Sequence, residues 1–194
     1  MYSRFGKRCF DVAAVLLILP AAVPAMLIVA SLVRWALGRP VLFRQVRAGR
    51  EGVAFELLKF RSMRLGPGED ADRLTRFGRL LRATALDELP QLLNILRGEM
   101  SLVGPRPLLP EYTARYTARQ RTRLAVRPGL CGLAQAQGRN AVPWDERLEW
   151  DARYVERVTF GGDLAIIWRC ARVVGRGQGA SMAGHATMER FDKG

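Results

Sequence analysis

The sequence VAAVLLILPAAVPAMLIVASLV occupies residues 12–33 and contains no charged residue. A straight helix of this length would extend about 33 Å, which matches the hydrocarbon thickness of a bilayer. We therefore expect the stretch to be a membrane segment. A cleavable signal peptide fits less well, because Asp11 abuts the apolar run, the run is long for a signal peptide, and no clear cleavage site of small residues follows it.

Pro20 and Pro24 lie inside this segment and predict a bend near its middle, because each removes an intrahelical N–H and clashes with the preceding turn. Basic residues flank both ends: Arg4, Lys7 and Arg8 precede the segment, and Arg34, Arg39, Arg44, Arg47 and Arg50 follow it. Because lysine and arginine favour cytoplasmic flanks, both ends are expected in the cytoplasm. A re-entrant hairpin of two half-helices satisfies this expectation, and an ordinary kinked span is the alternative.

The chain has 194 residues, which is enough for one domain with a real core. We expect residues 1–38 to form the membrane hairpin with its flanks, and residues 39–194 to form a cytosolic domain that folds as one unit with the hairpin. The cysteines, Cys9, Cys131 and Cys170, form no CxxC pair, and His185 is the single histidine. A disulfide framework, a zinc site and a histidine-based catalytic triad are therefore disfavoured, and any chemistry should use carboxylates and cations.

The net charge is strongly positive, because 31 lysine and arginine residues stand against 18 acidic ones and give a formal charge of +13. A basic surface of this kind favours polyanions such as nucleic acid, anionic lipid headgroups or a phosphorylated small substrate. Part of the arginine content is also explained by a compositional bias of the source. Charge alone therefore does not select a function.

The rest of the sequence predicts a mainly α-helical fold with one short β-hairpin. Extended stretches at 41–45 and 53–60 flank a turn-like segment at 48–52 and favour the hairpin. Apolar residues at helical spacing predict helices over 72–82, 110–125, 144–158 and 163–174, and the glycine-containing tail after Gly175 is expected to be loop. The helices at 72–82 and 163–174 are amphipathic and rich in arginine, which suits either a lipid interface or a packed inner face with a solvated outer one.

Two adjacent carboxylates, Asp87 and Glu88, are the first candidates for chemistry. Pro90 is tolerated in a helix only in the first turn, so Asp87 is expected at or beside the N-cap of a helix. The helix N-terminus would keep Asp87 ionised and attract phosphate, and an ionised aspartate can attack phosphorus. Glu88, about 100° further around the helix, could hold a divalent cation. An ordinary capping arrangement is the alternative.

Arginines and amides beside glycine or proline supply candidate binding residues for an anionic ligand. Pro105 and Pro107 enclose Arg106 and fix the backbone on both sides, so its guanidinium is pre-arranged for a phosphate or carboxylate, although a structural turn is the alternative. Similar settings surround Arg127, Gln135, Arg139 and Asn140, which could line a nucleotide or sugar pocket. No GxGxxG sequence follows a strand and no Walker loop is present, so dinucleotide-binding and P-loop folds are disfavoured.

Together and in this order, the motifs resemble those of the bacterial sugar transferases, in particular the small monotopic phosphoglycosyl transferases. The matching segments are KRCFD at 7–11, KFRSM at 59–63, LDELPQLLNIL at 86–96, GEMSLVGPRPL at 98–108, VRPGLCGLAQ at 126–135 and GRNA at 138–141. The resemblance covers essentially the whole chain. It is strongest to small members of the Campylobacter diacetylbacillosamine phosphotransferase type, and it includes the tail from Gly184 to Phe191.

This resemblance implies a fold and a reaction. The family members move a phospho-sugar from a UDP-sugar to a polyprenyl phosphate, release UMP and use Mg²⁺. In the matching positions, Asp87 would attack the β-phosphate and form a covalent phospho-sugar intermediate, and Glu88 would bind the metal. Arg106 would lie at the substrate site, with Lys59 and Arg82 close to the carboxylate pair. The implied fold is a re-entrant membrane helix with amphipathic interfacial helices around a compact catalytic domain.

The resemblance also implies a location and a set of partners. The protein would lie on the cytoplasmic face of the bacterial inner membrane, bound to the phospholipid bilayer, and would carry out the first membrane step of glycoconjugate assembly. Pro24 matches the family proline that breaks the membrane helix. The tail favours UDP-N,N'-diacetylbacillosamine or a related UDP-N-acetylated sugar, and a homodimer is open. The competing functions are a membrane-tethered nucleic-acid-binding module and an inactive scaffold, and no nucleic-acid motif supports the first.

Overall fold

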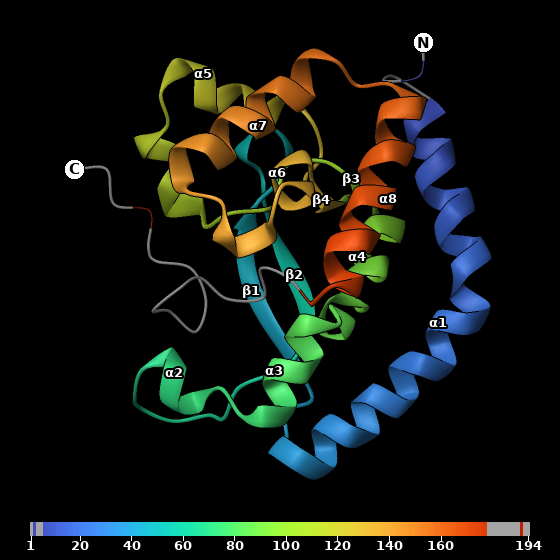
Figure 1. The fold of residues 1–194 in the computed structure, drawn as a ribbon, viewed down its shortest axis with the longest axis vertical. Helices are drawn as coiled ribbons and strands as arrows, with labels where there is room; N and C mark the ends of the chain where they lie inside the picture. The colour runs from blue at the N-terminus through green and yellow to red at the C-terminus, as the bar shows by residue number, and fades with distance from the viewer. Residues whose placement is uncertain (1, 3–5, 178–190, 192–194) are drawn as a thin grey trace.

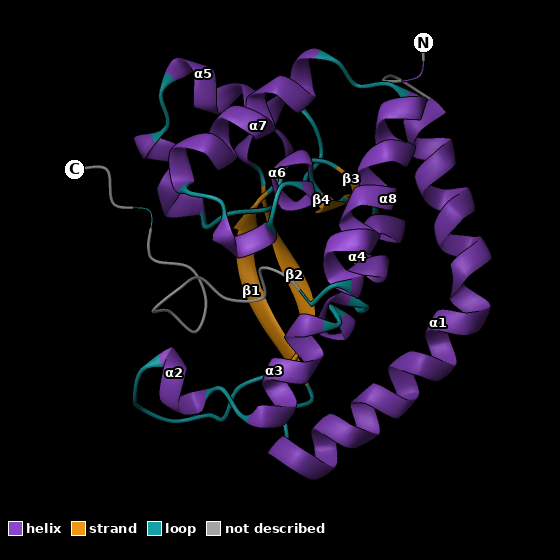
Figure 2. Ribbon diagram, in the orientation of Figure 1, coloured by secondary structure: helices purple, strands orange, loops and turns teal. Residues whose placement is uncertain are grey.

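The computed structural model describes residues 2, 6–177 and 191, and it is mainly helical with a small amount of strand (Figures 1 and 2). The elements are α1 (Lys7–Leu37), β1 (Leu42–Ala48), η2 (Arg50–Gly52), β2 (Ala54–Phe60), α2 (Asp70–Arg73), α3 (Arg76–Ala83), η3 (Leu86–Glu88), α4 (Gln91–Arg97), β3 (Ser101–Val103), η4 (Pro110–Arg115), α5 (Ala118–Arg121), η5 (Thr122–Ala125), β4 (Gly129–Cys131), α6 (Leu133–Ala136), η6 (Arg139–Ala141), α7 (Trp144–Glu156) and α8 (Phe160–Gly175). The predicted fold class, mainly α with a short hairpin, is confirmed at this level.

The apolar segment forms the long helix α1, which is long and apolar enough to cross a membrane. Pro20 and Pro24 both lie inside it. The helix is continuous from Lys7 to Leu37, so the two expected half-helices are joined without an interruption. Figure 1 shows that α1 changes direction midway along its length, in agreement with the bend expected from prolines inside a helix. Its outer side exposes large apolar residues, among them Leu17 and Trp35, which are 83% and 88% exposed.

Both ends of α1 are attached to the rest of the molecule by charged side chains. At the first turn, Lys7 Nζ lies 2.6 Å from Asp163 Oδ2 of α8, and the Arg8 guanidinium donates to two carbonyl oxygens at the end of α4. At the last turn, Arg61 donates to the carbonyl oxygens of residues 37–39. The Leu37 carbonyl is one that a helix terminus leaves without an intrahelical partner, and the other two follow directly in the chain, so Arg61 caps α1.

The inner side of α1 contributes to two hydrophobic clusters. Val15 and Ala22 belong to the main core, which also includes residues of β2, α4 and α8. Val29 and Val33 pack in a second cluster with Phe60 of β2 and with α3. The helix is therefore part of the core along most of its length. Only one side of it is free to contact lipid.

The predicted hairpin is present as β1 and β2, which pair antiparallel with Leu42 opposite Phe60 and Ala48 opposite Ala54. The short helix η2 forms the turn, and Glu51 has a φ of 58° there. Among the described residues a second sheet consists of β3 and β4, which pair in parallel. The sequence did not predict this second sheet, because three-residue strands carry too little alternation to be recognised.

Two of the predicted helices are divided by local capping, and these predictions were wrong in detail. The stretch 72–82 splits into α2 and α3 because Thr75 caps α3, with its hydroxyl accepting from the Gly78 N–H at 3.0 Å. The stretch 110–125 splits into η4, α5 and η5, since Thr117 and Gln120 form a capping box after the extended residue Tyr116. Competition from such side chains outweighs weak helical periodicity.

The remaining helix predictions are confirmed by α7 and α8. On α8, Phe160, Leu164 and Trp168 are 49%, 44% and 65% exposed and lie on one face, because they are spaced four residues apart. This is the expected amphipathic pattern. Of the predicted loop after Gly175, Arg176 and Gly177 form a turn, and residues 178–190 lie outside the described residues. The tail resemblance lies there too, except for Phe191, whose buried ring packs against Tyr112 and Trp144.

Candidate active site

The carboxylate pair lies in η3, the short helix between α3 and α4. Ala85 begins this turn in the left-handed conformation, with a φ of 56°. Pro90 is the N-cap residue of α4. Asp87 was expected at or beside this cap, but it lies about one turn before it. The reason is that the chain enters α4 through its own 3₁₀ turn. Asp87 and Glu88 are 6% and 8% exposed and both line a cavity.

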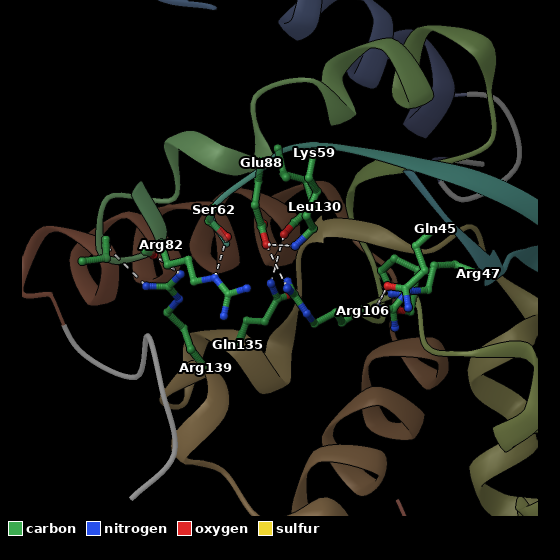
Figure 3. A network of polar contacts seen from close by, with 12 residues as sticks. Gln45, Arg47, Lys59, Ser62, Arg82, Glu88, Arg106, Leu130, Gln135 and Arg139 are labelled. Atoms are coloured by element: carbon green, nitrogen blue, oxygen red, sulfur yellow. Dashed lines mark hydrogen bonds and ion pairs between the residues drawn. The ribbon is translucent and has the colours of Figure 1, made fainter. Parts of the chain in front are cut away.

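Glu88 is neutralised by two cations. Its Oε1 accepts from Lys59 Nζ at 2.6 Å and from Arg106 Nη2 at 2.8 Å (Figure 3). Burial alone would raise the pKa of Glu88, but Arg106 and Lys59 outweigh burial and hold the pKa well below the usual range of glutamate. Glu88 is therefore ionised at neutral pH and is held in one position.

Asp87 has a different environment. Among the described residues, no group donates a hydrogen bond to its carboxylate, whereas Glu88 next to it accepts two. Burial raises the pKa of Asp87; Lys59 opposes that rise, and the negative charge of Glu88 adds to it. One member of the pair is thus fixed by ion pairs. The other is desolvated and receives no hydrogen bond from the part of the chain that the structure describes, which makes it the more nucleophilic carboxylate.

Arg106 is positioned by its backbone as well as by Glu88. The loop that carries it packs against the start of β4, where a Cβ on Gly129 would lie 2.0 Å from the Gly104 nitrogen, so only glycine fits. Buried Arg123 donates from Nη2 to the Arg106 carbonyl at 2.6 Å, and it also pairs with Asp151 Oδ2 at 2.8 Å. The close approach and the buried ion pair together fix the backbone that presents the Arg106 guanidinium to the cavity.

Arg82 and Arg139 lie on one side of Glu88 in Figure 3, and Gln45 and Arg47 lie on the other. Arg82 Nε donates to the Ser62 hydroxyl at 2.9 Å, and Arg139 Nη2 donates to the Arg82 carbonyl at 2.8 Å. The second of these bonds joins η6 to the end of α3. The basic residues therefore form a row that runs across the site on both sides of the carboxylate pair.

The cavity that these residues line has a volume of about 490 Å³. Among the described residues, its basic lining consists of Arg47, Lys59, Arg61, Arg64, Arg73, Arg82, Arg106, Arg139 and Arg147, and its acidic lining of Asp70, Asp87 and Glu88. Phosphate groups are favoured ligands of such a surplus of guanidinium groups. The arrangement can therefore bind a ligand with more than one phosphate and present it to the Asp87 carboxylate.

A family model described as bacterial sugar transferase matches residues 2–177. The chain belongs to the bacterial sugar transferase family. It is 44% identical to the sugar transferase EpsL of Bacillus subtilis over 95% of both chains. The resemblance inferred from the motifs is thereby confirmed for the family, and the diacetylbacillosamine type stays a prediction.

Two further relatives carry names that state a reaction. The sugar transferase is 40% identical to the UDP-glucose:undecaprenyl-phosphate glucose-1-phosphate transferase of Caulobacter vibrioides, over 84% of this chain and 67% of the relative. It is 38% identical to the undecaprenyl-phosphate galactose phosphotransferase of Salmonella typhimurium, over 92% of this chain and 42% of the relative. The chain therefore spans less than half of the Salmonella protein.

The structure brings most of the predicted site residues together. The cavity of the sugar transferase is lined by Lys59, Arg82, Asp87, Glu88, Arg106, Arg139 and Asn140. Pro105 and Pro107 flank Arg106 in the chain but do not line this cavity. Arg127 and Gln135 are not among its lining residues either: Arg127 Nε donates to the Gly98 carbonyl at 2.7 Å, and Gln135 Nε2 donates to the Leu130 carbonyl at 3.1 Å. Both bonds stabilise loops behind the site.

Sequence reasoning missed Arg47 and Arg147 as site residues of the sugar transferase. Arg47 lies near the end of β1 and Arg147 in α7, and both line the cavity. Arg147 follows no glycine or proline, so the pattern that identified Arg106 could not identify it. Its place in the cavity depends on how α7 packs against the rest of the fold, which no local motif encodes.

A magnesium ion is compatible with the residues present. Among the described residues, no group of three or more histidine, cysteine or acidic side chains forms an all-protein metal cage. Mg²⁺ usually keeps several waters and binds through one or two carboxylates together with substrate phosphates. Asp87 and Glu88 supply such carboxylates inside a cavity suited to phosphates, so the donor set of the sugar transferase fits this mode of binding.

Proposed function

We propose that this sugar transferase moves a phospho-sugar from a UDP-sugar to a polyprenyl phosphate and releases UMP. The observation that carries the proposal is the unequal pair: Glu88 is fixed by two cations, and Asp87 is desolvated and accepts no hydrogen bond from the described residues, inside a cavity crowded with arginines. The names of the Caulobacter and Salmonella relatives, which state sugar-phosphate transfer with undecaprenyl phosphate, support the same reaction.

The reaction proceeds in two displacements on the sugar-bearing phosphorus. First, a carboxylate oxygen of Asp87 attacks the β-phosphorus of the UDP-sugar, and the bond from that phosphorus to the bridging oxygen breaks, so its electron pair leaves with UMP. Second, a phosphate oxygen of the polyprenyl phosphate attacks the same phosphorus. The bond to Asp87 then breaks, its electrons return to the carboxylate, and polyprenyl-diphospho-sugar is the product.

The cations around Asp87 allow these anionic groups to meet. Attack by a carboxylate on a diphosphate brings like charges together, and fixed guanidinium groups offset that repulsion. Arg106 and Lys59 already neutralise Glu88, so its charge does not repel the incoming phosphates. When bound, Mg²⁺ would supply further charge neutralisation at the diphosphate, with Glu88 as the proposed metal-binding residue.

The sugar that we propose is N,N'-diacetylbacillosamine or another N-acetylated sugar carried by UDP. Support for it comes from the resemblance of the sequence, including the tail from Gly184 to Phe191. The relatives named above act, by their names, on galactose and glucose. A panel that includes UDP-galactose, UDP-glucose and UDP-N-acetylated sugars, assayed for UMP release, separates these sugars. Faster turnover of a plain hexose than of every N-acetylated sugar would overturn the proposed specificity.

We further propose that α1 is re-entrant and that the enzyme acts at the cytoplasmic face of the inner membrane. Support comes from the attachment of both ends of α1 to one folded body, through Lys7 and Arg8 at the start and Arg61 at the end. If the helix spanned the bilayer, one of these polar attachments would lie on the opposite side from the rest of the fold. The exposed apolar face of α8 would then lie in the plane of the interface.

The decisive experiment combines turnover with detection of the intermediate. Full-length protein in detergent, given a UDP-sugar, polyprenyl phosphate and Mg²⁺, should release UMP, and chelation of Mg²⁺ should stop it. Without the lipid acceptor, the protein should gain the mass of one phospho-sugar. Asp87→Asn should lose the adduct and lower UMP release by about a thousandfold or more, as loss of a nucleophile does in other covalent mechanisms.

Asp72→Asn is the matched control, since Asp72 is an exposed aspartate on α2 that does not line the cavity. It should retain both the adduct and the rate. An Asp87→Asn variant with the adduct and the turnover of the control would remove Asp87 from the reaction.

A further inference from the structure

Arg47 and Arg147 line the cavity, and within the described part of the chain the charge of neither is paired with a carboxylate. The Nε of Arg47 and the Nε of Arg147 are both buried and donate no hydrogen bond within the described part of the chain. The Nε atoms of Arg61 and Arg73 share this property, but Arg61 is engaged by the carbonyls at the end of α1, and Arg73 is paired with Asp70. Buried donors in folded proteins normally have partners, so an orphan guanidinium N–H that lines a cavity indicates a ligand.

The burial of Arg147 makes this observation specific. Arg147 is 4% exposed and lines the cavity, and its guanidinium carbon lies 5.3 Å from the centre of the Trp144 ring. Its Nη2 donates to the Arg139 carbonyl at 2.7 Å, which is an uncharged partner, and Asp151, the carboxylate one turn further along α7, is already paired with Arg123. Burial lowers the pKa of both Arg47 and Arg147 to about 10, which still leaves both charged at neutral pH.

The two sides of the cavity face different surroundings. Arg82 lies on α3, where Leu81 packs with Val29 and Val33 of α1 and Leu80 is 61% exposed. This side adjoins the apolar helix, so a phosphate carried by a lipid has a short path to it. In Figure 1 the second half of α1 and α3 lie together at the bottom of the molecule.

The other side belongs to elements with a charged outer surface. Arg147 lies on α7, whose exposed Glu149 pairs with Arg119 of α5 and with Arg153. Arg47 lies at the end of β1 that is farther from α1, because β1 begins at Leu42, soon after α1 ends. Figure 1 shows α5 and α7 at the top, away from the second half of α1. A water-soluble ligand can therefore enter the cavity from this side.

We propose that Arg47 and Arg147 bind the nucleotide end of the UDP-sugar and stabilise the UMP that leaves. This inference rests on the proposed function and divides the cavity by element: Arg47 of β1 and Arg147 of α7 for the phosphate of the soluble nucleotide, and Arg82 of α3 for the phosphate of the lipid acceptor. Arg139 is bonded to both Arg147 and Arg82 and lies where the two parts meet. Negative charge develops on the nucleotide phosphate as the bridging bond breaks, and cations without a protein counter-ion are the groups best able to accept it.

The kinetic test compares two specificity constants. In a double displacement, kcat/KM for the UDP-sugar reports only the half-reaction that releases UMP, and kcat/KM for polyprenyl phosphate reports only the second half-reaction. Arg47→Gln and Arg147→Gln should each lower kcat/KM for the UDP-sugar by about tenfold or more, the effect of losing a charge-assisted hydrogen bond. The constant for polyprenyl phosphate should change by less than about twofold.

Arg153→Gln is the matched control on the same helix. Arg153 stacks over Trp150 as Arg147 stacks over Trp144, but it lies on the outer surface and does not line the cavity. Its two specificity constants should both stay at the wild-type value. A loss confined to polyprenyl phosphate in the Arg147→Gln variant, or an equal loss in both constants, would overturn the assignment.

A binding measurement separates this inference from the proposed function. UMP alone, titrated into the full-length wild-type protein in detergent, should bind, and inorganic phosphate should bind more weakly because it lacks the nucleoside. Arg147→Gln should weaken UMP binding by about tenfold, and Arg153→Gln should not. Absence of UMP release in the turnover assay would refute the proposed function. Unchanged UMP affinity in the Arg47→Gln and Arg147→Gln variants would refute only the nucleotide side.

Discussion

At the scale of single residues, the carboxylate pair predicts a distinctive pH dependence. Asp87 must be ionised to attack phosphorus, and burial raises the pKa of its carboxyl group. Activity should therefore fall as the pH decreases through a value above the usual aspartate range of about 4. Glu88 should not contribute to this acid limb, because Arg106 and Lys59 keep it ionised at lower pH.

The measurement is kcat/KM for the UDP-sugar as a function of pH, with protein stability followed in parallel. If activity stayed constant down to about pH 4 while the protein remained folded, the desolvated state of Asp87 would be wrong. The Glu88→Asp variant offers a second comparison, since a shorter carboxylate at this position weakens the contacts to Lys59 and Arg106 and should alter the apparent pKa of Asp87.

The buried pair of Arg123 and Asp151 leads to a stability prediction. Both side chains are at most 2% exposed, and the pair holds the backbone carbonyl of Arg106. Asp151→Asn should leave a buried guanidinium without its counter-ion and lower the free energy of unfolding by about 3–5 kcal/mol. Chemical denaturation in detergent measures this loss, and kcat should fall as well because the Arg106 loop loses its support.

The control is Glu149→Gln on the same helix, because Glu149 forms only exposed ion pairs with Arg119 and Arg153. Its effect should stay within about 1 kcal/mol. Equal destabilisation by Asp151→Asn and Glu149→Gln would show that the buried pair does not support the Arg106 loop.

The sequence predicts a site residue well when the local backbone determines its position, and poorly when the packing of distant elements determines it. Asp87, Glu88 and Arg106 were identified because their prolines, and for Arg106 also the preceding glycine, restrict the backbone locally. Lys59 and Arg82 were named from the resemblance to the family. Arg147 was not found, because its position in the cavity results from the packing of α7. Arg127 was assigned to the site from its glycine and proline neighbours; it does not line the cavity, and its Nε donates to the Gly98 carbonyl.

At the scale of elements, α1 predicts where its two ends lie. Cys9 is exposed near the start of the helix, and Arg39 is exposed just after its end. Two single-cysteine variants test this, both with Cys131 and Cys170 replaced by alanine. The first keeps Cys9, and the second lacks Cys9 and carries Arg39→Cys. Each variant is treated with a membrane-impermeant thiol reagent. Both should react from the cytoplasmic side, because both ends are attached to the same folded body.

Inverted membrane vesicles and intact spheroplasts provide the two orientations for this experiment. Labelling of the two positions from opposite sides would establish a single span and contradict the re-entrant helix. An additional Arg61→Gln change would remove the cap of α1, and altered labelling at residue 39 would then show that the cap holds this end in place.

The elements also show where sequence patterns succeed. The hairpin, α7 and α8 were predicted because their apolar residues recur at regular spacing over enough residues to identify the element. The division of the stretch 110–125 into shorter helices was not predicted, although the sequence contains Thr117 and Gln120, which form the capping box. The long helix α1 was recognised from composition, but its continuity through Pro20 and Pro24 was not, because the packing of Val15, Ala22, Val29 and Val33 supports the helix on both sides of the bend.

At the scale of the whole molecule, the structure explains much of the net charge of +13. Nine of the basic side chains among the described residues line one cavity, where only three acidic ones accompany them. Charge gathered in a concave site of about 490 Å³ suits a small phosphorylated ligand, whereas a nucleic-acid-binding protein presents its basic groups on an extended surface. The location of the arginines therefore favours the transferase over the nucleic-acid-binding module.

The packing of the inner side of α1 against the core also determines how the enzyme can be handled in the laboratory. A fragment that starts after residue 38 would uncover the partners of Val15, Ala22, Val29 and Val33. It would also deprive Arg61 of the Leu37 and Gly38 carbonyls and Asp163 of its ion pair with Lys7. Such a truncated protein should aggregate when expressed, and size-exclusion chromatography would show it. The apolar helix α1 therefore cannot be removed as if it were only a membrane anchor. Screening for inhibitors has to use the intact polypeptide in nanodiscs or micelles.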